Sequence, residues 1–127
     1  MNSEQKVFDN LSRIKESIRL KQDSCGLKGL VTLVGVTKTQ TTETIITAIN
    51  AGLTNIGENR IQEASAKFKK IKFCNNITKH MIGHLQSNKV KKAIEIFDRI
   101  DSIDSKKLAN KINVVATAQK KNNPHLT

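Results

Sequence analysis

The stretch LVTLVGVT at residues 30–37 is the part of the sequence that decides the fold. It is a near-continuous run of β-branched and apolar residues, which is typical of a strand covered on both faces in a parallel sheet. Upstream of this run, Ser3 is a plausible N-cap, and apolar residues then recur at helical spacing from Val7 to Ile18. The sequence therefore predicts an N-terminal amphipathic helix and then a buried strand that ends at Lys38.

Downstream of this strand, one pattern repeats: a short apolar strand, a polar turn and a helix with an apolar stripe on one side. Further strands are expected at residues 54–59, 79–86 and 99–104, and helices at 41–50, 60–72, 87–97 and after a cap at Asp104 or Ser105. Strands that alternate with helices of this length indicate βαβ units and a parallel sheet. Four units make half of a (β/α)8 barrel of about 200–250 residues. A small doubly wound sheet would be complete at this length, and the pattern alone leaves both open.

Length and composition favour one domain. The chain has 127 residues, of which 37% are hydrophobic, and no stretch approaches the roughly 18 apolar residues of a membrane span. Its first ten residues contain neither a basic leader nor an apolar signal core. Cys25 and Cys74 are far apart and form no CxxC pair, which indicates free thiols. We therefore expect residues 1–127 to form a single cytoplasmic domain.

The net charge of +11 raises the question of a nucleic-acid partner. The excess of basic residues is spread over residues 67–72, 88–92, 105–107 and 119–121. Each group lies within or beside an apolar pattern of helical period, so solvated helix faces are the simpler interpretation. Four Phe and no Tyr or Trp offer few rings for base stacking. A basic nucleic-acid-binding protein stays an alternative, which steeply salt-dependent retention on a DNA or RNA column would favour.

Polar residues gather at the four predicted strand ends, where ligands bind in parallel α/β folds. These ends carry Lys38, the turn 57–59, the segment 80–86 and the segment 101–104. A lysine at such a place is usually a solvated boundary residue. It becomes a nucleophile towards aldehydes only where partial burial or a nearby cation favours its uncharged form. The Gly-Glu-Asn turn can likewise be a simple connection, in which Asn59 caps the next helix.

His80 and His84 raise the question of a zinc site, because two histidines four residues apart on a helix can face one metal ion. Residues 81–83 are predicted as strand, however, in which residues four apart lie about 13 Å from each other. No third ligand is evident, so we expect no metal site. Ser87 or Asn88 is then simply the cap of the following helix.

Three segments, in this order and spacing, resemble the pyridoxal phosphate homeostasis family: VTLVGVTKT (31–39), AGLTNIGENRIQEA (51–64) and HMIGHLQSNKVKK (80–92). The motifs GEN-x-x-QE and IGHLQSNK are the most distinctive parts of a similarity that runs from about Leu30 to Leu108. The resemblance implies a fold similar to the barrel domain of alanine racemase. The fold expected for this chain is therefore a partial (β/α)8 TIM-type barrel, with about four βα units after an N-terminal helix.

The resemblance also implies a cofactor and the residues that bind it. Lys38 matches the lysine that forms an aldimine with pyridoxal 5′-phosphate, Asn59 matches an asparagine near the cofactor, and the third strand end supplies His80, Gly83 and His84. The implied function is cofactor homeostasis: the protein would hold the cofactor reversibly and deliver it to apo enzymes that depend on it, without turning over a substrate.

The chain departs from the family in its extent and at a few positions. Family members continue through four more strands, and the resemblance implies that loops near the last strands hold the cofactor phosphate. Those loops would lie beyond Thr127, so a truncated gene, a split gene and a fragment that pairs with another half all stay open. In each case we expect weaker binding of the cofactor than in a complete barrel. Thr37 replaces a common serine, and Lys79 and Met81 replace aromatic residues. An amino-acid racemase is an alternative, but such racemases use a tyrosine from another domain, and this chain has no Tyr.

Overall fold

The four strands of the sheet are short, parallel and arranged in the order in which they occur along the chain. The computed structural model describes residues 3–27, 29 and 31–122. Its strands are β1 (Gly35–Val36), β2 (Asn55–Glu58), β3 (Thr78–Met81) and β4 (Arg99–Ile100). The sheet order is β1-β2-β3-β4, and every pairing is parallel. Each crossover therefore returns the chain beside the strand that it has just left.

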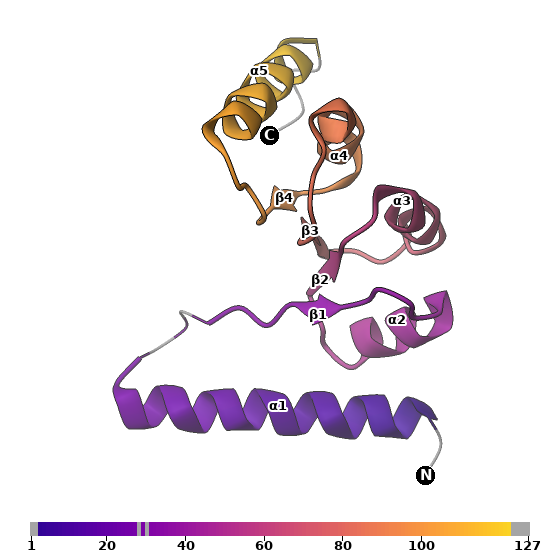
Figure 1. The fold of residues 1–127 in the computed structure, drawn as a ribbon. Helices are drawn as coiled ribbons and strands as arrows, with labels where there is room; N and C mark the ends of the chain where they lie inside the picture. Colours follow the sequence, from indigo (N-terminus) through magenta and orange to yellow (C-terminus); the bar gives the residue numbers. More distant parts are fainter. Residues whose placement is uncertain (1–2, 28, 30, 123–127) are drawn as a thin grey trace.

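Helices alternate with these strands and lie outside them. They are α1 (Ser3–Cys25), α2 (Thr42–Asn50), α3 (Ile61–Lys70), the 3₁₀ helix η1 (Ser87–Lys89), α4 (Val90–Ile96) and α5 (Lys106–Asn122). Figure 1 shows the helices α2 to α5 as an arc around the strands, with α1 alongside α2. A doubly wound sheet would reverse its strand order at a switch point, and this sheet does not. The predicted partial (β/α)8 barrel is confirmed.

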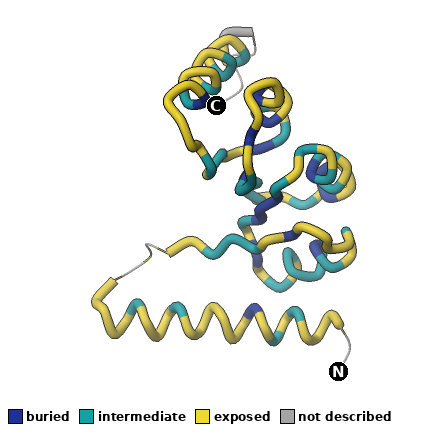
Figure 2. The backbone as a smooth tube through the Cα atoms, in the orientation of Figure 1, coloured by how far each residue is buried: buried dark blue, intermediate teal, exposed yellow. Residues whose placement is uncertain are grey.

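The core lies where the helices meet the sheet (Figure 2). Ile56 of β2 and Met81 of β3 are at most 1% exposed, and the rings of Phe68 and Phe97 pack edge to face with centroids 5.3 Å apart. The helix stripes predicted from the sequence supply most of the remaining buried apolar residues, including Ile45, Ala64, Phe68, Ile71, Val90, Ala93, Phe97 and Leu108. Burial of these apolar side chains stabilises the fold and sets the position of each helix on the sheet.

Some predicted helix caps are confirmed and others are wrong. Ser105 caps α5, because its hydroxyl accepts a hydrogen bond from Leu108 N at 3.1 Å. The cap of α3 is Arg60 and not Asn59, and the cap of η1 is Gln86 rather than Ser87 or Asn88; neither makes a side-chain cap bond. Asn59 therefore lies one residue before the cap of α3, in the turn after β2.

The strands are shorter than predicted. The first strand was expected at residues 30–37, but β1 covers only Gly35–Val36, and Leu30 lies outside the described residues. Val31 and Val36 are 51% and 52% exposed, so the expected cover on both faces is wrong. The reason is that β1 is an edge strand, and the helices of the described residues cover one side of the sheet. The third and fourth strands also end early, at Met81 and Ile100.

The apolar stripe predicted for α1 is only partly buried. Leu11 is buried at 9% exposure, whereas Phe8 and Ile14 are 50% and 44% exposed. This helix packs mainly against α2, and Lys15 Nζ donates to Gly52 O at 3.0 Å just beyond the end of α2. One neighbour covers only part of the stripe. Within the described part of the chain, no helix combines the length and the apolar character needed to cross a membrane.

Candidate functional site

Hydrogen bonds tie the carboxyl ends of neighbouring strands together. Three bonds each join the end of one strand to the next: from Thr37 N to Gly57 O (3.0 Å), from Ile82 N to Glu58 O (3.0 Å) and from Asp101 N to Met81 O (2.9 Å). They continue the register of the sheet beyond the last paired residues. The residues that follow the four strands are therefore brought to one edge of the sheet, as the sequence predicts.

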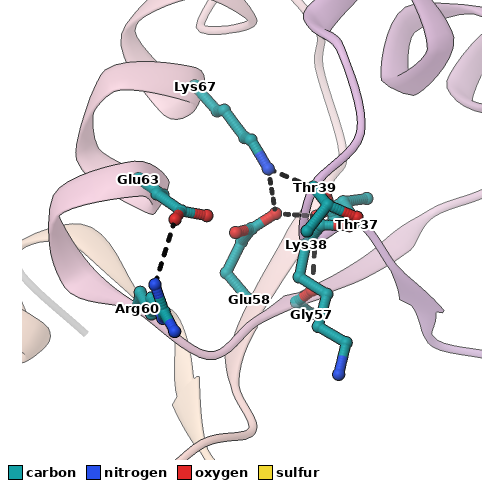
Figure 3. Close-up of polar contacts among 8 residues, drawn as sticks. All are labelled: Thr37, Lys38, Thr39, Gly57, Glu58, Arg60, Glu63 and Lys67. Carbon is teal, nitrogen blue, oxygen red and sulfur yellow. Dashed lines mark hydrogen bonds and ion pairs between the residues drawn. The ribbon is translucent and has the colours of Figure 1, made fainter.

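Lys38 lies in a tight turn after β1, and its side chain is exposed. Gln40 N donates to Thr37 O at 3.1 Å, which closes the turn around Lys38 and Thr39. Thr39 has a φ of 63°, which is rare for a β-branched residue, and its hydroxyl donates to Lys38 O at 2.6 Å. Figure 3 shows that the Lys38 side chain extends away from Glu58 and Lys67. Its amine is therefore exposed to solvent, and the partial burial expected of a reactive lysine at this strand end is not found among the described residues.

A buried ion pair lies beside Thr37 (Figure 3). The Glu58 side chain is 0% exposed, and its Oε2 lies 3.0 Å from Nζ of Lys67, which is 14% exposed. Lys67 Nζ also donates to Thr37 O at 2.7 Å, and the Thr37 hydroxyl donates to the same Glu58 oxygen. The other carboxylate oxygen, Glu58 Oε1, is buried without a hydrogen-bond partner among the described residues. Charged groups from β2 and α3 therefore hold the residue immediately before Lys38.

His80 faces the side of the sheet opposite the helices. Its neighbour Met81 lies in the core, and successive side chains of a strand alternate between faces. His80 Nδ1 is 2.8 Å from Asp101 Oδ2, and Nε2 is 2.9 Å from Asn55 Oδ1. The side chain is 4% exposed. Both ring nitrogens have protein partners, so His80 links β2, β3 and the segment after β4.

Asn59, Gly83 and His84 lie in the turns after β2 and β3. A Cβ on Gly83 would be 2.5 Å from Asn59 Cβ and 2.6 Å from Asn59 O, so only glycine permits this approach of the two turns. The Ser102 hydroxyl donates to Gly83 O. His84 is 71% exposed, and its Nδ1 lies 3.4 Å from Asp104 Oδ2. The structure thus places Asn59 against Gly83, and His84 at the exposed rim.

A groove of about 750 Å³ opens beside Asn59 and His84, along α3 and the start of α4. Its lining includes the cationic residues Arg60, Lys69, Lys89 and Lys92. Glu63 is the acidic residue among the lining residues, and it pairs with Arg60 at 3.7 Å. The excess of positive charge favours the approach of an anionic ligand to this edge of the sheet.

Sequence reasoning missed the buried cluster of Thr37, Glu58 and Lys67. The interpretation of Lys67 as part of a solvated helix face is wrong, because its amine is in contact with Glu58 and Thr37. Two signals could have revealed the cluster. Glu58 follows the buried Ile56 by two residues, which places both on one face of β2, and Lys67 follows the buried Ala64 by three, which places both on one side of α3.

Comparisons with known proteins agree with these motifs. No protein-family model matches the chain. The pyridoxal phosphate homeostasis protein of Vibrio alginolyticus is 38% identical over 111 residues, which cover 84% of this chain and 48% of that protein. The protein of the same name from Escherichia coli strain K12 is 34% identical over 110 residues, which cover 84% of this chain and 47% of that protein. Over most of its length, the chain is homologous to the pyridoxal phosphate homeostasis proteins.

The chain spans somewhat less than half the length of the curated family members that it matches. Two solved structures are similar over most of the chain. PipY of Synechococcus elongatus PCC7942, with PLP bound, is 34% identical with a TM-score of 0.78, over 89% of this chain and 49% of that one. A protein from Bifidobacterium adolescentis is 33% identical with a TM-score of 0.85, over 94% of this chain and 53% of that one. These likenesses support the partial barrel.

Proposed function

We propose that this chain binds pyridoxal 5′-phosphate reversibly through Lys38 and takes part in the homeostasis of that cofactor. The observation that carries the proposal is the exposed Lys38 at the end of β1, at the sheet edge where Asn59 and Gly83 meet. The comparisons support it, because PipY has PLP bound and the curated relatives are named for pyridoxal phosphate homeostasis.

The side chains at this edge suit a ligand with an aldehyde and a phosphate. The cofactor supplies an aldehyde carbon that bonds to a primary amine with the loss of one water molecule. Lys38 offers such an amine in an exposed position, and the half-buried Asn59 offers an amide that both donates and accepts hydrogen bonds. The cationic groove beside Asn59 and His84 favours the approach of a phosphate. The residues present therefore fit the ligand.

In this proposal the side chains hold and orient the ligand and catalyse no reaction of a substrate. Asn59, which is fixed against Gly83, and His84 at the rim offer hydrogen bonds at the same edge of the sheet as Lys38. His80 uses both ring nitrogens within the protein, so we assign it to shaping the sheet face on which the ligand rests. The chain has no Tyr that could serve as the second base of a racemase.

We place this task in the cytoplasm, as buffering and delivery of the cofactor. A ligand that is held by a reversible bond can pass to apo enzymes that depend on it, which are the proposed recipients. We further propose that residues 1–127 act as one half-barrel unit. In that case, the unpaired edges of β1 and β4 would join the second half of such a barrel.

A spectrophotometric titration tests the proposal. The purified chain is mixed with increasing pyridoxal 5′-phosphate, and the absorbance change that accompanies bonding of the aldehyde to a lysine is followed. We expect saturation at one cofactor per chain, with reversal on dialysis. Lys38→Met should abolish saturable binding, while the matched control Lys70→Met, an exposed lysine at the end of α3, should bind like the wild type.

Two results would contradict the proposal. Saturable binding that survives Lys38→Met would assign the attachment point to another lysine. A wild-type chain that shows folded far-UV circular dichroism but no saturable binding would refute cofactor binding by this chain.

A further inference from the structure

Thr37 is fixed at each of its polar atoms. Its N–H donates to Gly57 O, its hydroxyl donates to Glu58 Oε2, and its carbonyl accepts from both Lys67 Nζ and Gln40 N. Two of these partners, Glu58 and Lys67, are charged side chains, so these contacts restrict the position of the residue before Lys38.

The group that fixes Thr37 is not explained by stability alone. Burying an ion pair removes two charges from water, and well-packed apolar side chains at the same place are often as stable or more stable. Glu58 is completely buried, and its Oε1 has no hydrogen-bond partner in the part of the chain that the structure describes, which adds to the cost of this arrangement. Energetically costly features of this kind are expected near functional sites, where the geometry of the site takes precedence over stability.

The residue after Lys38 is also held in an unusual conformation. Thr39 adopts a φ of 63°, and its hydroxyl donates to Lys38 O at 2.6 Å. A β-branched residue with positive φ is strained and persists only where its surroundings determine the backbone. Lys38 therefore lies between Thr37, which is held by the ion pair, and Thr39, whose strained turn directs the chain towards α2.

We propose that the buried Glu58–Lys67 pair positions Lys38. By holding the carbonyl and the hydroxyl of Thr37, it fixes the backbone from which the Lys38 side chain projects, so that the amine leaves the strand end in one direction (Figure 3). Glu58 and Lys67 act through Thr37 and do not touch the ligand. This inference rests on the proposed binding of pyridoxal 5′-phosphate at Lys38.

The main test is the double variant Glu58→Gln/Lys67→Met, which removes both charges and keeps side chains of similar volume. The rate and the affinity of cofactor capture are measured by absorbance, and the fold is monitored by circular dichroism and thermal melting. A misplacement of a reacting group by about 1 Å can cost about a hundredfold in rate, so we expect a loss of about tenfold or more. In the double variant, reduction with borohydride and peptide mapping should also show that part of the adduct moves from Lys38 to other exposed lysines.

A second pair of variants keeps every charge in place. Thr37→Val removes the hydroxyl, which lies within hydrogen-bond distance of both Glu58 Oε2 and Gly57 O, and Thr37→Ser retains it. We expect Thr37→Val to slow capture and Thr37→Ser to restore most of the rate. If the pair had a purely structural role, Thr37→Val and Thr37→Ser would capture the cofactor at the same rate when their melting temperatures are equal. If the double variant fails to fold, this pair decides the question.

The outcomes separate the inference from the proposed function. If the wild type fails to capture the cofactor at Lys38, the proposed function is refuted. If the wild type captures it, and the folded double variant or Thr37→Val captures it with the same rate, affinity and preference for Lys38, the positioning role is overturned while cofactor binding stands. Lys70→Met, on the same helix as Lys67, should leave capture unchanged.

Discussion

The ion pairs Glu16–Arg19 and Glu58–Lys67 lie at opposite extremes of burial. In α1, the Glu16 and Arg19 side chains are 55% and 57% exposed, and their charged atoms are 2.5 Å apart. Between β2 and α3, the exposed fractions of Glu58 and Lys67 are 0% and 14%, and the distance is 3.0 Å. The exposed pair has the shorter contact, yet the buried pair is the one attached to a candidate site.

This difference shows that distance alone does not indicate what an ion pair does. Water screens an exposed pair, so it contributes little to stability even at short range. A buried pair gives up the hydration of both charges, so the loss of one partner leaves the other charge without compensation. Burial, together with the backbone atom that the pair contacts, indicates its role. For Glu58–Lys67 that backbone atom is Thr37 O, next to Lys38.

The largest effect is expected from Lys67→Met. This change leaves the Glu58 carboxylate buried without a cation, and breaking a buried pair in this way costs about 3–5 kcal/mol in the free energy of unfolding. Urea denaturation followed by circular dichroism measures it, with Lys70→Met as the control on the same helix. A loss no larger than that of the control would show that water reaches Glu58, and the contrast between the two pairs would disappear.

Gly83→Ala tests whether a change that involves no charge also destabilises this edge of the sheet. The new Cβ would lie 2.6 Å from Asn59 O, a backbone atom that cannot move aside easily. Overpacking of this kind costs about 1–3 kcal/mol, and Asn59 should be displaced. Urea denaturation measures the loss, and cofactor titration measures the effect on binding. Unchanged values in both would show that the turn after β3 adapts and does not fix Asn59.

A smaller change in stability is expected for the double variant Glu58→Gln/Lys67→Met. Removing both charges avoids the uncompensated carboxylate, so its free energy of unfolding should be within about 1 kcal/mol of the wild type, since neutral replacements of buried pairs are often tolerated. The difference between this variant and Lys67→Met, measured in one urea series, gives the coupling of the two side chains. A double variant as unstable as Lys67→Met would show that the pair contributes packing rather than charge.

The smallest effect is expected for Glu16→Gln. The side-chain hydrogen bond from Arg19 lowers the pKa of Glu16 below its ordinary value of 4.5. A carboxyl group with a lowered pKa stabilises the fold at pH values above the unfolded pKa, and this contribution is lost as the pH falls through the folded pKa. Thermal melts at low salt should therefore show a slight loss at pH 7 that disappears in acid. If Glu16→Gln lost as much stability as Lys67→Met, the exposed pair would matter as much as the buried pair, which would contradict the account.

The exposed pair Glu16–Arg19 can be predicted from its spacing in the sequence, whereas the buried pair Glu58–Lys67 cannot be predicted from spacing. Glu16 and Arg19 are three residues apart on a predicted helix, a spacing that places them side by side. Glu58 and Lys67 are nine residues apart across the end of a strand, a turn and two turns of helix. Their contact depends on how α3 lies over β2, and this depends on the packing of Ile56, Ala64 and Phe68.

The order of the elements and the helix stripes followed from local periodicity, and the strand ends located Lys38 and Asn59. The partners of His80 did not follow, because Asn55 belongs to β2 and Asp101 follows β4, and both meet His80 only through the register of the sheet. The strand lengths were overestimated for a related reason. A run such as residues 30–37 indicates apolar character, whereas the length of a strand depends on the neighbour with which it pairs.

Attachment of the cofactor to Lys38 is tested most directly by mapping the lysines that react. The wild-type chain is incubated with pyridoxal 5′-phosphate, reduced with borohydride, digested and analysed by mass spectrometry. We expect the adduct to be concentrated on the peptide that contains Lys38, even though lysines such as Lys70 and Lys89 are also exposed. An adduct spread over the exposed lysines without preference for Lys38 would contradict the account.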